Sequence, residues 1–446
     1  MTANDAMAHT VMSYRSFEGQ AVTTGYTNET FGYAQSPMAR DIAAMQYLYG
    51  ANYETRSGDT VYRWSTSTGE KFINGVGQGA PGGNKVFETI WDGGGVDTFD
   101  LSNYSTALTI DLTPGGWTNF NNNQRANLGN GQMAPGNVAV AYLFEGNPAR
   151  LIENAIGGTG DDRITGNVAG NVLVGGAGND TIYGVGGQNI LIGDGVGNEF
   201  SIVGLRQSEV IAVDLPKVST GGNDVLVGGN GNDLFVPGLG HNEVRGGGGT
   251  DTVVLDFNRD ALTITASVDG VMNIVYAGGS VKMSGVEILA LRDGIFALDG
   301  SVPASAADGG FGDDVALLYQ AGFGRSADAP GLAYWTDKVH SQADLREVAL
   351  SFLDSDEFEH RFGTSDNMAA ADYVGVLYRN ILDREGEAEG LNYWTQKLSS
   401  GSTNQADLLL AFAFSEENRQ SAAPQADEFG FVAISKTDWA AIWAKI

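Results

Sequence analysis

The chain has 446 residues, of which 54 are acidic and 25 are basic, so its formal net charge is −29. This charge argues against nucleic acid as a partner and favours the binding of cations. The absence of cysteine excludes disulfides, thiolate metal sites and thiol catalysis.

No apolar run in the sequence approaches the roughly 20 residues of a transmembrane helix. Residues 1–17 have neither a basic start nor an apolar stretch, so we expect no N-terminal signal peptide. Export of this chain is therefore expected to use a C-terminal or internal address.

The first predicted element is a helix from Asp41 to Tyr49. Ile42, Met45, Leu48 and Tyr49 recur there at helical spacing. The pattern predicts an amphipathic helix that packs these apolar residues on a core, without a catalytic role.

A nine-residue repeat occupies residues 157–254 and carries most of the information. Four repeats run in phase from Gly157, a degenerate fifth begins at Gly193, and four more begin at Ser219. The sixth position is always Asp or Asn, and the eighth is always a large apolar residue. Glycine permits the turn, the carboxylate supplies hard oxygen ligands, and the eighth residue points inward from a short strand. This is the pattern of the calcium-binding RTX repeat. A Gly-rich flexible linker, the alternative, does not require an apolar residue every nine positions.

Two such repeats make one turn of a parallel β-roll, so residues 18 apart are expected to stack. The predicted stacks are Asp162 with Asp180 and Asn198, Asn171 with Asn189, Asp233 with Asp251, and Asp224 with Asn242. Calcium affinity rises with ligand charge. We therefore expect strong sites at Asp162/Asp180 and Asp233/Asp251, and weaker or empty sites on the opposite edges.

Residues 255–298 alternate apolar and polar side chains, with turn signals at Asp269-Gly270 and Gly278-Gly279. This pattern predicts antiparallel strands that close the open end of the roll. Small residues at 301–310 indicate a linker.

Residues 311–423 contain two related helical units. Their matching positions lie 59 residues apart: Tyr319/Tyr378, Arg325/Arg384, Gly331/Gly390 and Trp335/Trp394. The duplication predicts a repeated helical module. It resembles a family of unknown function that is often attached to secreted RTX proteins. Tyr and Trp are expected in the core of each unit, whereas the arginines fit either ion pairs or a ligand site.

The tail, 424–446, fits either a type I secretion signal or a final packing helix.

Several segments upstream of the repeats occur in a familiar order. They are HTVMSYRSF around Met12, SPMARDIAAMQYLYGAN, TRSGDTVY, IWDGGGVDTFDLSNY and LIENAIGGTGDD. Together with the repeats they resemble the serralysins, secreted zinc proteases of the metzincin group, over residues 8–300. The resemblance implies that 1–55 correspond to the end of a metzincin catalytic domain, with Met12 in the Met-turn and Tyr14 as an accessory zinc ligand. Residues 56–300 would then be a serralysin-type C-terminal domain.

The zinc motif of that family is missing from this sequence. Serralysins bind zinc through H-E-x-x-H-x-x-G-x-x-H, in which the Glu is the general base. The four histidines here are His9, His241, His340 and His360, and none is followed by Glu. A catalytic zinc needs three protein ligands. We therefore expect neither zinc nor peptidase activity from the chain as given.

The calcium ligands of the family match this sequence more closely than its zinc ligands do. The resemblance implies a first site from Arg56, Gly58 and Thr60 with Asp92, Gly94, Gly95 and Asp97, although Asp92 and Asp97 also fit turn-capping carboxylates. A second pattern couples Leu151 and Glu153 to the first repeats, through Gly158, Gly160, Asp162, Gly175, Gly176, Gly178 and Asp180. The later repeats add Asp224, Asp233 and Asp251.

The sequence thus predicts a mainly β protein, a parallel β-roll with flanking antiparallel strands, plus a separate all-α C-terminal repeat domain. We expect a secreted, non-catalytic, calcium-binding RTX protein that displays a helical binding module. Its expected partners are several calcium ions, a type I secretion apparatus and an unknown extracellular ligand, without nucleic acid or a membrane span. The alternative is the C-terminal part of a serralysin-like zinc endopeptidase whose catalytic segment is encoded upstream of Met1.

Overall fold

The computed structural model describes residues 5–194, 221–266, 271–298, 311–324, 335, 345–363, 368–382, 386–415 and 431–434. The chain divides into two compact units. One comprises Met1–Val302 with Glu428–Phe431 and Ile446, and the other comprises Pro303–Asp427 with Val432–Lys445. The first unit is built of largely parallel sheets and the second of helices, which confirms the predicted fold class.

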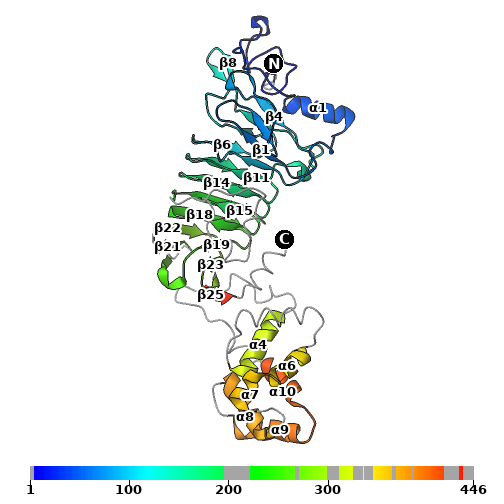
Figure 1. Cartoon of the computed structure of the whole chain (residues 1–446), viewed down its shortest axis with the longest axis vertical. Helices are drawn as coiled ribbons and strands as arrows, with labels where there is room; N and C mark the ends of the chain where they lie inside the picture. Colours follow the sequence, from blue (N-terminus) through cyan, green and yellow to red (C-terminus); the bar gives the residue numbers. More distant parts are fainter. Residues whose placement is uncertain are drawn as a thin grey trace. The chain divides into compact units, whose positions relative to one another are not determined.

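The β-roll consists of two sheets whose strands alternate along the chain (Figure 1). The first sheet has the order β25 (Phe431–Ile434), β24 (Ile295–Leu298), β23 (Ile288–Leu291), β19 (Thr252–Leu255), β17 (Leu234–Val236), β15 (Ile190–Ile192), β13 (Val172–Val174), β11 (Asn154–Ile156), β5 (Thr98–Asp100), β1 (Val61–Trp64), β2 (Lys71–Ile73) and β3 (Val76–Gly77). The second sheet has the order β20 (Thr263–Ala266), β21 (Met272–Tyr276), β22 (Gly279–Ser284), β18 (Gly240–Gly248), β16 (Val225–Asn230), β14 (Thr181–Val185), β12 (Arg163–Thr165) and β6 (Thr109–Asp111).

Successive turns of the roll stack in parallel register. Ile164 lies opposite Ile182, and Leu173 lies opposite Leu191, as the 18-residue spacing predicts. The register then continues across the interruption after Asp194, because Ile182 pairs with Leu226. Asn198, which was predicted to share the edge of Asp180, lies outside the described residues.

The eighth residue of each described repeat fills the space between the two sheets. These side chains are fully buried: Ile164, Leu173, Ile182, Leu191, Leu226, Phe235, Val244 and Val253. Burying one such side chain contributes about 1.5–3 kcal/mol. The repeat therefore forms a continuous apolar core, and the glycines are left for the turns at both edges.

The end of the roll differs in part from the prediction of antiparallel strands. β22 pairs in parallel with β18, and β23 pairs in parallel with β19, so these two strands add a further roll turn. Antiparallel pairing joins β20 to β21, β21 to β22, and β23 to β24. The prediction was wrong here because Ile288–Leu291 forms a strand like those of the repeats, although no complete Gly-rich turn precedes it in the sequence.

The N-terminal part of the first unit packs a smaller core beside the roll. It contains α1 (Ala39–Tyr49), the sheet of β4 (Glu88–Ile90), β10 (Val138–Val140) and β7 (Trp117–Thr118), the hairpin β8 (Asn127–Gly129) and β9 (Gln132–Met133), and three single turns, η1 (Val22–Thr24), η2 (Gly82–Asn84) and η3 (Pro148–Arg150). A fourth single turn, η4 (Arg259–Ala261), precedes β20.

The predicted helix is present, but its apolar face was assigned wrongly. Ala39, Ile42 and Gln46 are its buried residues. Met45, Leu48 and Tyr49 are exposed, at 45, 67 and 85%. Asp41 fixes the start of this helix, because its carboxylate accepts hydrogen bonds from the backbone of Met38 and Val11. These hydrogen bonds orient the helix so that Met45, Leu48 and Tyr49 face outward.

The helical unit contains α4 (Phe311–Phe323), α6 (Leu345–Leu353), α7 (Asp356–Phe362), α8 (Ala370–Leu382), α9 (Ala388–Ser399) and α10 (Gln405–Ala413). Its two repeats build the same aromatic cluster. The Phe352 ring contacts Tyr319 and Trp335, and the Phe412 ring contacts Tyr378 and Trp394. The tyrosines and tryptophans thus pack into the core as predicted. Arg325, Arg384 and Gly331 lie outside the described residues.

No helix in the described parts of the chain is both long and apolar enough to cross a membrane.

Candidate metal sites along the roll

Acidic and amide side chains form one ladder on each edge of the roll. The first edge holds the residues that precede or begin strands of the second sheet: Asp162, Asp180, Asp224 and Asn242. The second edge holds the residues that precede strands of the first sheet: Thr60, Asp97, Glu153, Asn171, Asn189, Asp233, Asp251 and Glu287. The ladder members inside the repeats follow from the pattern, because its sixth residue stands just before the strand or, at Asn242, near its start.

One oxygen of each side chain holds the next layer. Along the first edge, the backbone N–H of Asp162 donates to Asp180 Oδ1 at 2.8 Å, and that of Asp180 donates to Asp224 Oδ1 at 2.8 Å. Along the second edge, Asp233 N–H donates to Asp251 Oδ1 at 2.8 Å. Such bonds fix the orientation of every carboxylate in the ladder.

The other oxygen of five carboxylates has no partner. These atoms are Oδ2 of Asp97, Asp180, Asp224, Asp233 and Asp251, all buried and without a hydrogen bond. A buried, unpaired carboxylate oxygen is costly, since neither water nor a donor compensates its charge. The energetic demand for a cation is therefore concentrated at these five atoms.

Burial also raises the pKa of these carboxyl groups. It raises the pKa of Asp180 and Asp251 to about 8 and that of Asp224 to about 7. The pKa values of Asp162 and Asp233 rise to about 6. For Asp180, the charges of Asp224 and Asp162 add to the effect of burial. A bound cation would reverse these shifts, because it favours the ionised form.

Backbone carbonyls crowd the same edges. A Cβ at Gly178, which has φ +122°, would collide with the carbonyl oxygen of Gly160. A Cβ at Gly222 would collide with the carbonyl oxygen of Gly178. Glycine is therefore required, and the carbonyl oxygens of successive turns come close to the carboxylates.

This donor set suits calcium. Within the described residues, no group of three or more His, Cys, Asp or Glu side chains could hold a metal ion on its own. The edges offer single carboxylates together with carbonyl oxygens, which are the hard, mixed ligands that Ca²⁺ takes in numbers of six to eight. Zinc prefers four nitrogen or sulfur ligands.

The structure brings together the residues predicted for the first site. Thr60 N–H donates to Asp97 Oδ1 at 2.9 Å, and a Cβ at Gly95 would touch the backbone of Gly58. Asp92 caps Gly94 through Oδ1 and accepts from the Tyr62 hydroxyl through Oδ2. The turn-capping alternative thus describes Asp92, whereas Asp97 keeps an unpaired oxygen.

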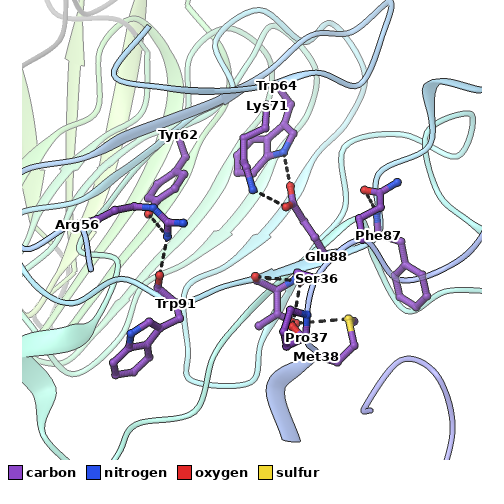
Figure 2. Close-up of polar contacts among 12 residues, drawn as sticks. Ser36, Pro37, Met38, Arg56, Tyr62, Trp64, Lys71, Phe87, Glu88 and Trp91 are labelled. Atoms are coloured by element: carbon purple, nitrogen blue, oxygen red, sulfur yellow. Dashed lines mark hydrogen bonds and ion pairs between the residues drawn. The ribbon is translucent and has the colours of Figure 1, made fainter. Parts of the chain in front are cut away.

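Arg56 serves this site through its guanidinium group. It donates to the carbonyl of Trp91 at 2.7 Å and to the Tyr62 hydroxyl at 3.3 Å (Figure 2). These bonds tie the 56–60 loop to the segment that carries Asp92 and Asp97. Arg56 itself has φ 51°, a backbone angle that residues other than glycine rarely adopt.

The predicted second pattern is divided between the two edges. Glu153 Oε2 accepts the N–H of Asp97 at 2.8 Å, so Glu153 belongs to the second edge, and the neighbouring Leu151 is buried. Gly158, Gly160 and Asp162 instead stack on Gly176, Gly178 and Asp180 of the first edge, with Gly175 against Gly157. The coupling of Glu153 to the first repeat was therefore wrong, because a roll alternates its turns between opposite edges.

The interruption of the repeats after Asp194 hides from the sequence that Asp224 and Asp180 are neighbours. Asp224 was assigned to a weaker edge with Asn242, yet it lies directly beside Asp180, 44 residues away. The acidic run of the first edge is therefore Asp162, Asp180 and Asp224. Within the second edge, the acidic run comprises Asp233, Asp251 and also Glu287, whose Oε2 accepts the N–H of Asp251 at 2.8 Å.

Glu287 was missed by the sequence analysis because it lies outside the repeats. Its signal is its position directly before the apolar strand Ile288–Leu291, the same position that Glu153 has before β11. Burial raises its pKa, as for the other ladder carboxylates.

The described histidines are scattered and have hydrogen-bond partners. His9 bonds to Glu18, His241 to Ser280, and His360 to the carbonyl of Asp356. His340 lies outside the described residues. Met12 and Tyr14, the residues likened to the Met-turn, are 78 and 72% exposed.

Comparison with known proteins agrees with this geometry. The family described as peptidase M10 serralysin C terminal matches residues 51–290. The family described as domain of unknown function (DUF4214) matches residues 311–362 and 349–422.

Three curated proteins show the same relationship. Serralysin from Proteus mirabilis is 38% identical over 172 residues, which cover 38% of this chain and 30% of that protein. Metallopeptidase AprA from Pseudomonas marginalis is 38% identical over 175 residues, covering 38% and 31%. Serralysin G from Dickeya chrysanthemi is 37% identical over 169 residues, covering 38% and 30%. The chain thus spans about a third of the length of the relatives it matches.

Proposed function

This chain belongs to the peptidase M10 serralysin C-terminal family, and on that basis we propose that it is a secreted calcium-binding scaffold. In this proposal, calcium ions occupy both edges of the roll and complete its folding. The scaffold then presents the helical unit to an extracellular ligand. The observation that carries the proposal is the set of five buried carboxylate oxygens without a partner.

Calcium coupling would also suit export. Carboxylates of adjacent turns repel one another, and two unit charges about 4 Å apart repel by roughly 4 kcal/mol at an effective dielectric near 20. Several such pairs offset a typical net stability of roughly 5–15 kcal/mol. A cell interior poor in calcium would keep the roll unfolded for a type I secretion apparatus, and a calcium-rich exterior would fold it.

The test is a binding titration of the purified full chain with calcium, with magnesium as the matched control. We expect several calcium ions per chain and little competition from magnesium, which demands a smaller, octahedral site. Native mass spectrometry of the same samples counts the ions. A chain that binds no calcium at millimolar concentration contradicts the proposal.

A second candidate is the C-terminal part of a zinc endopeptidase, as in the serralysins that this chain matches. Exposed apolar side chains near the N-terminal core favour it: Met12, Tyr14, Tyr47, Leu48 and Tyr49. Such a face suits contact with a further domain. The discriminating observations are an in-frame H-E-x-x-H before Met1, and hydrolysis of casein that a zinc chelator abolishes.

A further inference from the structure

The second edge of the roll contains a stretch where amides replace carboxylates. Between Glu153 and Asp233, the ladder positions are Asn171 and Asn189. Both side chains are buried. Asn189 Oδ1 keeps the ladder function, since Asn171 N–H donates to it at 3.0 Å, as Asp233 N–H does to Asp251 Oδ1. Asn171 Oδ1 instead accepts the N–H of Asn167 in its own repeat.

The second polar atom of each asparagine has partners, in contrast to Oδ2 of the five aspartates described above. Asn171 Nδ2 donates to the Glu153 carbonyl at 2.8 Å and to Asn167 Oδ1 at 3.1 Å. Asn189 Nδ2 donates to Asp233 Oδ1 at 2.8 Å and to the Gly187 carbonyl at 3.3 Å. Where an aspartate leaves Oδ2 unpaired, an asparagine thus supplies hydrogen atoms to nearby oxygens.

A third asparagine extends this cluster inward. Asn167 Nδ2 donates to the carbonyls of Ile152 at 2.8 Å and Leu112 at 3.2 Å, and its own N–H donates to Asn171 Oδ1. The asparagine clamp, defined as Asn167, Asn171 and Asn189, therefore satisfies the carbonyls of Leu112, Ile152, Glu153 and Gly187.

The turns around the clamp differ from the others. Asn167 and Ala169 stand where Gly176 and Gly178 stand in the next repeat, and Val185 is held at φ 79°. A β-branched residue is strained in that region. These turns have lost glycines that elsewhere let carbonyls of adjacent layers approach the carboxylates.

We propose that the asparagine clamp is a metal-free joint, in which amide hydrogens take the place of a calcium ion between Glu153 and Asn189. Calcium would then bind in separate groups: around Asp97 and Glu153, along Asp162, Asp180 and Asp224, and along Asp233, Asp251 and Glu287. The inference rests on the proposed calcium binding and specifies where along the roll it stops.

The clamp can do without a metal ion because its side chains are uncharged and donate hydrogen bonds. A neutral amide removes the repulsion that two adjacent carboxylates would impose, and it donates to carbonyls that a cation would otherwise coordinate. The clamp would therefore stabilise the middle of the second edge at any calcium concentration. The layers on the first edge beside it, Asp162 and Asp180, would still require the ion.

Calcium-loaded crystals of the full wild-type chain test this directly through the anomalous scattering of calcium. We expect peaks in contact with Asp180, Asp224, Asp233 and Asp251, and none in contact with Asn171 or Asn189 Oδ1. A peak on either asparagine together with peaks on the aspartates overturns the joint alone. The absence of every peak overturns calcium binding itself, and the joint with it.

Two variants of the full chain provide a second test by ion counting and thermal melting. Asn171→Ala should keep the calcium count and lower the melting temperature in saturating calcium by several degrees, because the Glu153 carbonyl loses its donor. Asp180→Ala, the matched variant on the first edge, should lower the count by at least one. A lower count in Asn171→Ala, or an unchanged melting temperature, contradicts the joint.

Discussion

The backbone N–H of Asp180 donates to Oδ1 of Asp224 at 2.8 Å, although 44 residues separate them in the chain. The roll therefore continues through the interruption without losing a layer, and the two carboxylates share one edge. Their charges raise the cost of the metal-free state, since Asp224 contributes to the raised pKa of Asp180.

This pair gives the first prediction. Asp180→Asn should raise the calcium concentration at which the first unit is half folded, because the site loses a charged ligand. At 100 times its Kd, one site adds about 2.7 kcal/mol, so the loss of this site should also lower the melting temperature in saturating calcium by a few degrees or more. Asn179→Ala, in the same turn but exposed, is the control and should leave the calcium midpoint unchanged.

The second prediction concerns pH in the absence of calcium. Burial raises the pKa of Asp180 and Asp251 to about 8, and that of Asp224 to about 7, from an ordinary value of 3.8. The folded roll therefore binds more protons than the unfolded chain between about pH 4 and 8. Its stability is highest below that window and falls as the pH rises through the folded-state pKa values.

Far-ultraviolet circular dichroism in chelator at several pH values checks this sign. The β signal of the roll should increase on acidification from about pH 8 to about pH 5, whereas in saturating calcium that increase should vanish or reverse, because protons then compete with the ion. A β signal in chelator that falls on acidification over this window argues against buried, unpaired carboxylates.

A third prediction addresses the core. Leu191 is fully buried and stacks between Leu173 and Phe235. Leu191→Ala should lower the free energy of unfolding by roughly 2–5 kcal/mol in saturating calcium. Val168→Ala, at a side chain that is 63% exposed, is the control and should change it by less than about 0.5 kcal/mol. Denaturant titration measures both, and equal effects would mean that the repeats are not stacked as described.

Sequence reasoning predicted much of this architecture because the repeat fixes both the strand and its inward residue. It could not assign the edges fully, since that requires counting turns across an interruption whose length is not a multiple of the repeat. The pairing of Asp224 with Asp180 was missed for this reason, whereas its predicted stacking on Asn242 is confirmed. Glu287 was missed because it lies outside the nine-residue repeats, and the outward face of α1 depends on a tertiary anchor between Asp41 and Val11.

The fourth prediction is that the helical unit does not depend on calcium. Its core forms from its own residues, including Tyr319, Phe352, Tyr378 and Phe412. Hydrogen exchange of the full chain in calcium and in chelator should show unchanged protection in α8 and α10, beside a large loss in β12–β19. Loss of protection in the helices on chelation would show that they need the folded roll.

The central claim is that calcium completes the folding of residues 51–298 through the carboxylates of the two edges. Far-ultraviolet circular dichroism of the full chain, followed during a calcium titration from chelator at pH 7.5, tests it most directly. We predict a cooperative gain of β signal with calcium, over a helical signal that stays constant, and no such gain with magnesium. A β signal already complete in chelator would contradict the account.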